Sequence, residues 1–431
     1  MKSLCLNCLR QTLKDGRCTS CGKNAGFTQQ PVFALPAGTV LGGRYLTGGV
    51  LGFGGFGITY LGLDLTEERR IAIKEFMPAS VSGRTPGYVK VSVKDQDNFE
   101  YGLKRFCDEA RTIYKYRHHP NIVHVYKLFK ENGTAYYVME YLEGRDLKAV
   151  LKLRGGQMDF SSLMKIMLPV MEALECVHAD HVIHRDISPD NIFVGNTVKL
   201  IDFGAAREAF AGQSKSLSII LKRGFAPEEQ YRSHGVQGPW TDIYALAGTM
   251  YYALTGAMVP EAPERLVNDE IKDITQTGAV LPQFSAAAIM KALSVKAESR
   301  YQNVADFKTA LLYPAGENRS VTGCPADAGG FKMYGLDGFY AGASLTVEDS
   351  IVIGRDASAC QLVYPKDARG ISKRHCRLSF DAAKSLVIAE DLYSTFGTCV
   401  NGRMLVRGSE AALSSGDMIS FGENQIFKIV I

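Results

Sequence analysis

The chain lacks a long apolar segment, and this absence excludes a large class of proteins. None of its 431 residues belongs to an uninterrupted apolar stretch of about 18 or more residues, roughly the length that a membrane-spanning helix needs. The first residues, Met1–Cys5, also lack the apolar core of a secretory signal peptide. We therefore expect no membrane span and no secretion, and we predict a cytoplasmic location.

The chain also has little net charge. Its 49 Lys and Arg residues oppose 45 Asp and Glu residues, and the basic residues are scattered rather than gathered in one stripe. Proteins that bind nucleic acids usually present a concentrated basic surface, so we expect no nucleic-acid partner. The length of the chain predicts two or three domains.

Only four of the ten cysteines follow a regular pattern. Cys5 and Cys8 form one Cys-x-x-Cys pair, and Cys18 and Cys21 form a second pair nine residues further on. Two such pairs on a short segment are typical of a tetrahedral zinc site, in which each tight turn presents two thiolates. The segment resembles a zinc ribbon with a structural Zn²⁺, whose binding would supply the folding energy. Two disulfides or a redox-active pair are the alternatives.

The other cysteines are scattered along the chain. Those within apolar patterns predict buried, reduced thiols, and they are Cys107, Cys176, Cys360, Cys376 and Cys399.

A phosphoryl-transfer motif lies near the middle of the chain. His184–Asn191 reads HRDISPDN, and Asp202–Gly204 reads DFG. Asp186 can accept the proton of a hydroxyl group, and Asn191 and Asp202 have the oxygen ligands that Mg²⁺ prefers. These residue types at this spacing are the parts of a site that transfers phosphate from ATP.

Further parts of the same machinery appear in the expected order along the chain. They are the glycine-rich turn Gly52–Gly57, the strand-like segment Ile71–Lys74, the turn His119–Val123, the apolar strand Tyr136–Glu140, the segment Ala226–Glu228 and the helix start Trp240–Tyr244. A glycine-rich turn alone would be weak evidence. The ordered set resembles a bacterial branch of the Hanks-type serine/threonine protein kinases.

The resemblance implies a bilobal kinase fold that uses ATP and two Mg²⁺ ions. In this family Asp186 would be the catalytic base, Lys74 would hold the α- and β-phosphates, and Asn191 and Asp202 would each bind one Mg²⁺. Residues expected to contact ATP, with Met139 as the gatekeeper, are Leu51, Gly52, Gly54, Gly57, Thr59, Ala72, Lys74, Met139, Glu140, Leu142 and Phe193.

The resemblance also implies two ion pairs. Lys74 needs a carboxylate partner, which we expect to be Glu109 on a helical stretch, with Asp108 as the alternative. Glu228, the last residue of Ala226–Glu228, is expected to pair with Arg300 and so to join distant parts of the large lobe.

Other residues would support the catalytic loop, which is the segment His184–Asn191. Asp242 would hold the backbone of this loop. Arg185 precedes the catalytic aspartate, and such an arginine usually pairs with a phosphorylated residue of the activation segment. Ser214, Ser216 and Ser218 are the candidate phosphosites, although a merely polar loop is an equally good interpretation of each serine.

Two residues depart from the family pattern. Ser188 stands where these kinases usually carry lysine, two residues after the catalytic aspartate, and Leu221 stands where they carry threonine, about five residues before the alanine of Ala-Pro-Glu. Charge on the γ-phosphate needs a cation. We therefore hypothesise that Lys222 supplies the missing cation, the alternative being an ordinary surface lysine.

The C-terminal part alternates short apolar strands with turns, which predicts a β-sandwich. Gly354–Arg355, Ser372–His375, Asp391–Gly402 and Gly416–Gly422 are its markers, and together they resemble a forkhead-associated (FHA) domain, a module that binds phosphothreonine peptides.

The resemblance implies a phosphate site at one end of this sandwich. Arg355 and Lys373 would supply charge, and Ser372 and Thr395 would supply hydroxyl donors. His375 would stabilise the loops from within. Phe396 replaces an asparagine that often grips the peptide backbone, so peptide affinity would be reduced, and a degenerate sandwich used only for protein contacts is the alternative.

The expected fold class is therefore α+β, a kinase flanked by a zinc ribbon and an all-β FHA sandwich. The expected domains are a zinc-ribbon-like segment 1–26, a linker 27–43, a kinase 44–313 with small lobe 44–140 and large lobe 144–313, a linker 314–330 and an FHA domain 331–431. The expected partners are protein substrates and phosphothreonine proteins or the chain's own phosphosites, Thr322 being one possibility. A pseudokinase scaffold and a small-molecule phosphotransferase are disfavoured alternatives, because every catalytic residue and the Ala-Pro-Glu segment are present.

Overall fold

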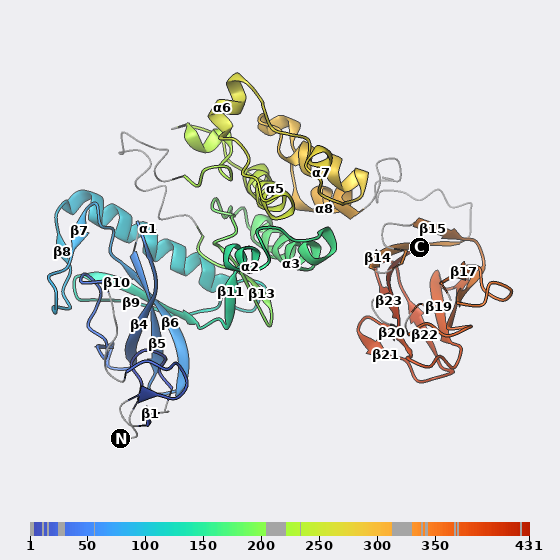
Figure 1. Cartoon of the computed structure of the whole chain (residues 1–431), viewed down its shortest axis with the longest axis horizontal. Helices are drawn as coiled ribbons and strands as arrows, with labels where there is room; N and C mark the ends of the chain where they lie inside the picture. The colour runs from blue at the N-terminus through green and yellow to red at the C-terminus, as the bar shows by residue number, and fades with distance from the viewer. Residues whose placement is uncertain are drawn as a thin grey trace. The chain divides into compact units, whose positions relative to one another are not determined.

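The structure is a computed structural model that forms two compact units, residues 1–309 and 310–431 (Figure 1). The residues it describes are 4–10, 13–14, 17–24, 31–55, 57–203, 221–232, 234–312, 330–337, 339–340, 344–365, 368, 370–422 and 425–431. The two units are described separately.

The first unit begins with an antiparallel six-stranded sheet in the order β3-β4-β5-β6-β10-β9. Its strands are β3 (Val40–Leu41), β4 (Tyr45–Gly54), β5 (Gly57–Asp64), β6 (Arg69–Phe76), β9 (Val125–Glu131) and β10 (Thr134–Glu140). Two small hairpins accompany it, β1 (Leu13–Lys14) with β2 (Arg17–Cys18), and β7 (Ser82–Gly83) with β8 (Ser92–Val93).

One long helix, α1 (Gln96–Lys115), packs on this sheet. The Asp95 side chain caps its start by accepting a hydrogen bond from the backbone N–H of Asn98. Apolar residues at helical spacing are buried along one face, and among them Phe106 contacts Phe76 and Tyr137 of the sheet. This contact fixes the face that α1 turns toward β6 and β10.

The segment expected as a linker packs against the sheet from residue 31 onward. Leu35 and Leu41 are fully buried, and the backbone N–H of Leu35 donates to the Tyr60 hydroxyl. β3 lies within this segment and pairs with β4, so the sheet begins before residue 43.

The second part of the first unit is mainly helical. Its elements are α2 (Leu147–Leu153), α3 (Phe160–Ala179), α5 (Pro239–Thr255), α6 (Ala262–Val267), α7 (Gln283–Ala292) and α8 (Val304–Leu312), the 3₁₀ turns η2 (Glu228–Tyr231), η3 (Ile274–Gln276) and η4 (Ala297–Ser299), and the strands β11 (Gly144–Asp146), β12 (Ile192–Gly195) and β13 (Val198–Leu200). Every residue from Thr241 to Tyr251 is buried, so α5 is the central helix of this lobe. The expected two-lobed kinase fold is confirmed.

The second unit is a sandwich of two sheets, as the sequence predicts. One sheet has the order β15-β14-β24-β23-β20-β21 and the other β17-β16-β18-β19-β22. The strands are β14 (Phe331–Asp337), β15 (Ser344–Val347), β16 (Ser350–Gly354), β17 (Leu362–Val363), β18 (Cys376–Asp381), β19 (Leu386–Asp391), β20 (Thr398–Val400), β21 (Arg403–Met404), β22 (Glu410–Leu413), β23 (Met418–Phe421) and β24 (Gln425–Val430). Alternate residues such as Ile351 and Ile353 point into the core between the sheets.

In the described part of the chain, the structure contains no helix that is both long enough and apolar enough to cross a membrane.

Candidate functional site

Lys74 on β6 lies between two carboxylates. Its Nζ atom is 2.6 Å from Asp202 Oδ1 and 3.5 Å from Glu109 Oε1. Glu109 is buried, whereas the alternative partner, Asp108, is half exposed and pairs with Arg111 one turn along α1. The structure thus brings Lys74, Glu109 and Asp202 together and leaves Asp108 outside.

The charge of Lys74 is held by these neighbours. Burial alone would lower the pKa of Lys74, but the Asp202 and Glu109 carboxylates outweigh burial and raise that pKa well above its usual value. Lys74 therefore remains a cation at neutral pH, as a phosphate ligand must.

The glycine-rich turn is the hairpin between β4 and β5, in which Gly52 pairs with Thr59 and Gly54 with Gly57. Side chains at Gly52 and Gly54 would meet no neighbouring atom within 4 Å, so the backbone is open to a ligand there. At Gly57 glycine is required for a different reason, because a Cβ atom there would lie 1.9 Å from the carbonyl oxygen of Glu75 on β6.

The expected adenine site lies at the end of β10. Met139 pairs with Ala72 across the sheet, so the expected gatekeeper and another residue expected to contact ATP are neighbours. The side chain of Glu140 is occupied, since it accepts hydrogen bonds from the His124 backbone and from Lys199. Leu142 follows in the connection to β11, Phe193 lies on β12, and Leu51 is half exposed on β4.

The start of α5 binds the backbone of the catalytic loop. Asp242 accepts hydrogen bonds from the backbone N–H groups of His184, at 2.8 Å, and Arg185, at 2.7 Å. The expected support of the loop by Asp242 is confirmed. Asp186 is nearly buried, and the Asn191 amide donates to its backbone carbonyl and to its carboxylate.

Lys222 reaches the catalytic loop from the activation segment. Its Nζ atom lies 2.6 Å from Ser188 Oγ, 3.7 Å from Asp186 Oδ2 and 3.5 Å from Asp190 Oδ2. Burial alone would raise the pKa of Asp190, but Lys222 and Lys148 outweigh burial and lower it. Lys222 is thus a cation beside the expected base and not an isolated surface lysine.

The expected pairing of Glu228 with Arg300 is wrong. Arg300 binds the next residue, Glu229, through both carboxylate oxygens at 2.8 and 3.1 Å, and both side chains are buried. Glu228 instead pairs with the exposed Arg232. The chain therefore carries one more residue between Ala226 and the buried glutamate than Ala-Pro-Glu suggests.

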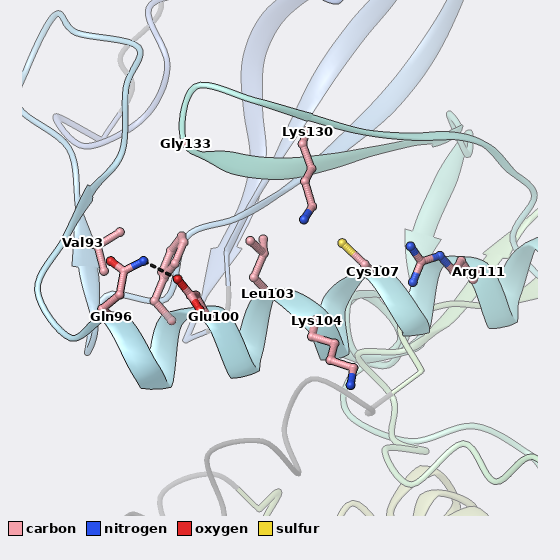
Figure 2. A pocket seen from close by; sticks show the side chains of 10 residues that line it. Val93, Gln96, Glu100, Leu103, Lys104, Cys107, Arg111, Lys130 and Gly133 are labelled. Atoms are coloured by element: carbon pink, nitrogen blue, oxygen red, sulfur yellow. Dashed lines mark hydrogen bonds between the residues drawn. The ribbon is translucent and has the colours of Figure 1, made fainter.

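Figure 2 shows a pocket between α1 and the hairpin of β9 and β10. Leu103 and Cys107 of the helix, with Lys130 and Gly133 of the β9–β10 hairpin, line this pocket of about 440 Å³. The pocket therefore lies beside the contact between α1 and the sheet, and Cys107 is buried there.

The N-terminal cysteines form one cluster. The four Sγ atoms lie within 4.8 Å of one another, with Cys5 and Cys21 at 3.8 Å and Cys8 and Cys18 at 3.5 Å. Zn–S bonds of about 2.3 Å in a tetrahedron place the sulfurs about 3.8 Å apart, so the cluster fits zinc. Burial raises the pKa of the Cys8 thiol to about 12, so binding of a metal would displace protons.

In the second unit, the loops expected to bind phosphate are connected to each other by hydrogen bonds. The backbone N–H of Thr395 donates to Ser372 Oγ at 2.9 Å, and the N–H of Arg355 donates to the Ser372 carbonyl at 3.1 Å. His375 is buried beneath the loops, accepts from the Ser372 N–H and contacts the Gly397 carbonyl at 3.0 Å. The expected internal role of His375 is confirmed.

Sequence reasoning missed one residue at these loops. Arg407 donates to the Thr395 carbonyl at 2.7 Å and so fixes a residue expected to bind phosphate. Its position after the β21 strand, in a segment with no marker of its own, gave no signal in the sequence.

Several expected residues lie outside the described ones. They are Gly204 of the DFG segment, the candidate phosphosites Ser214, Ser216 and Ser218, and Thr322.

These features define a protein kinase with an FHA module. A family model described as "Protein kinase domain" matches residues 45–320, and one described as "FHA domain" matches residues 351–422. The chain belongs to the protein kinase family and carries an FHA domain.

Similar proteins include bacterial serine/threonine kinases. "Serine/threonine-protein kinase Pkn1" of Myxococcus xanthus is 30% identical over 298 residues, which is 66% of this chain and 40% of that protein. "Serine/threonine-protein kinase F" of Synechocystis sp. is 32% identical over 264 residues, 57% of this chain and 48% of that protein. The chain thus spans less than half the length of these relatives. A solved structure, "PpkA-294 apo form", is 33% identical with a TM-score of 0.60 and covers 65% of this chain and 99% of its own.

Proposed function

We propose that the chain is an active protein kinase that transfers the γ-phosphate of ATP to serine or threonine hydroxyls of proteins. The observation that carries the proposal is the convergence of Lys74, Glu109 and Asp202 at the small lobe with Asp186 and Asn191 at the catalytic loop. All five charged or amide groups that the chemistry needs are present, and this supports the proposal.

Each of these residues would have a distinct role. Asp186 would accept the proton of the substrate hydroxyl, and Lys74 would hold the α- and β-phosphates, with Glu109 fixing its position. Asn191 and Asp202 would hold Mg²⁺, which when bound neutralises charge on the phosphates. Lys222, 3.7 Å from Asp186, would place a cation where the γ-phosphate is transferred.

The flanking modules would add a zinc site and a phosphothreonine site. Cys5, Cys8, Cys18 and Cys21 would hold one structural Zn²⁺. Arg355, Ser372, Lys373 and Thr395 would bind phosphothreonine in a partner or in the chain itself. We propose the cytoplasm as the location, because the reaction consumes ATP.

The test is incubation of the purified chain with Mg-ATP, followed by mapping of phosphosites by mass spectrometry, with Asp186→Asn alongside. We expect phosphorylated residues in the wild-type chain and none in the variant. Equal phosphorylation of both would refute the role of Asp186. The absence of phosphate in both, with ATP bound, would favour a pseudokinase scaffold.

A further inference from the structure

The two cysteine turns share one backbone hydrogen bond but differ in the residue that follows the second cysteine. In each turn the residue after the second cysteine donates its N–H to the carbonyl of the first cysteine at 2.8 Å, from Leu9 to Cys5 and from Gly22 to Cys18. Both residues adopt positive φ, 71° for Gly22 and 52° for Leu9. Glycine accepts this conformation without strain, whereas leucine does not. A reason specific to its side chain must therefore retain leucine at position 9.

That side chain is buried against the nucleotide-binding strand. Leu9 is only 3% exposed, and a Cβ atom at Gly48 of β4 would lie 3.0 Å from Leu9 Cγ and 2.8 Å from the Leu6 carbonyl oxygen. The pairing of β4 with β5 is irregular between Thr47 and Val50, where the cysteine turn contacts the strand. By contrast, a side chain at Gly22 would meet nothing within 4 Å. The first turn thus docks on the small lobe through Leu9, whereas the corresponding residue of the second turn, Gly22, is exposed.

This docking site adjoins two parts of the ATP site. β4 continues from Gly48 into the glycine-rich turn that begins at Gly52. The residue after Leu9, Arg10, lies 3.7 Å from Glu143 in the segment that joins the two lobes. Both partners are half exposed, so this pair contributes little by itself, and the burial of Leu9 is the principal link.

We propose that the cysteine module is a zinc-dependent latch on the nucleotide site. Zinc bound to the four thiolates holds the strained turn closed. The closed turn keeps Leu9 on Gly48 and so fixes the strand that carries the glycine-rich turn. Loss of zinc releases Leu9 and weakens nucleotide binding. This inference rests on the zinc site proposed above and assigns it a regulatory role.

The test measures zinc content and nucleotide affinity separately on the full chain. Zinc is determined by elemental analysis, and affinity by titration with a fluorescent ADP analogue in Mg²⁺, before and after treatment with a zinc-selective chelator. We expect one zinc per chain and at least about fivefold weaker nucleotide binding after its removal, a typical strength of coupling between sites.

Leu9→Gly separates the latch from the metal site. Glycine suits the backbone of this turn, as in the sister turn, so we expect the variant to retain zinc. Its nucleotide affinity should match that of the zinc-free wild type and no longer respond to the chelator. Gly48→Ala, which must displace the Leu6 backbone, should likewise make the ratio of affinities with and without zinc close to one. Arg17→Ala, an exposed arginine of the same module, is the control and should behave as wild type.

Equal nucleotide affinity of zinc-loaded and zinc-free wild-type chain would overturn the latch and leave the zinc site intact. A wild-type chain without zinc would overturn the zinc site and the latch together. If removal of zinc still weakened nucleotide binding in Leu9→Gly and Gly48→Ala, coupling through these residues would also be refuted.

Discussion

At the scale of single residues, Lys222 and Ser188 form the most unusual pair in the catalytic site. The buried glutamate is Glu229 rather than Glu228, so the family register must be counted from one residue later. With that shift the threonine position falls on Lys222, and Ser188 already occupies the lysine position. The cation and the hydroxyl have therefore exchanged places relative to the family pattern, and in this chain they contact each other at 2.6 Å.

This exchange predicts the outcome of a reciprocal substitution. Lys222→Thr should lower kcat about 100-fold, because it removes a cation that lies 3.7 Å from Asp186. The double variant Ser188→Lys/Lys222→Thr should recover most of the lost rate, since it restores a cation from the catalytic loop. Steady-state kinetics with a generic protein substrate measure both effects. A Lys222→Thr variant with wild-type kcat would show that Lys222 has no catalytic role.

His184 supports the same loop as a neutral residue. Burial lowers its pKa to about 4, and only the Asp242 and Asp202 carboxylates and the hydrogen bond to Ile201 oppose this. Between pH 6.5 and 4 the unfolded chain therefore binds a proton at His184 that the folded chain does not, so stability rises with pH in this range. The contribution is on the order of 3 kcal/mol, fully present above about pH 6.5 and lost toward pH 4.

Urea unfolding at several pH values checks this, because Trp240, the only tryptophan, reports on the large lobe. We expect the urea midpoint to fall as the pH is lowered from 6.5 to 4, and to fall less steeply in His184→Gln. If the urea midpoint fell equally steeply with pH in both proteins, the pH dependence of stability would come from other groups.

At the scale of elements, the turn η2 is fixed to the large lobe by one buried ion pair. Removal of Glu229 would leave Arg300 charged and buried, so Glu229→Ala should cost about 3–5 kcal/mol of unfolding free energy. Glu228→Ala is a matched control on the neighbouring residue, whose partner Arg232 is 62% exposed, and should cost at most about 1 kcal/mol. Trp240 fluorescence during urea unfolding measures both. Equal losses would mean that the pair does not anchor the turn.

The order of the elements could be predicted from sequence, whereas contacts between distant residues could not. The glycine-rich turn, the catalytic loop and the FHA markers each have a local pattern, because the chemistry requires particular residue types at fixed spacing. Glu75 has no such pattern. It is fully buried, pairs with Arg84 and accepts hydrogen bonds from the Tyr60 and Tyr136 hydroxyls.

The partners of Glu75 come from three separate segments, and only the folded chain brings them together. The shift from Glu228 to Glu229 was hidden for a similar reason. Two adjacent glutamates are indistinguishable in a motif, and only the position of Arg300 selects between them.

At the scale of the whole molecule, one unit would produce the group that the other unit binds. The first unit carries the proposed site for phosphate transfer, and the second carries loops suited to a phosphorylated side chain. A phosphate has nearly two negative charges and three acceptor oxygens, which suits Arg355 and Lys373 with the hydroxyl of Ser372. If both proposals hold, the chain would recognise a product of its own reaction, in a partner or at its own phosphosites.

Arg355 is the residue that tests this link. Arg355→Ala should weaken binding of a phosphothreonine peptide more than tenfold, because a charge-assisted hydrogen bond contributes about 2 kcal/mol. Fluorescence anisotropy with the phosphorylated peptide and its unmodified twin measures the effect. Lys384→Ala, in the exposed turn between β18 and β19, is the control and should bind as wild type. If the phosphorylated and unmodified peptides bound equally, the FHA sandwich would make protein contacts without recognising phosphate. Phe396→Asn would then be the first substitution to test, because asparagine often occupies this position in the family.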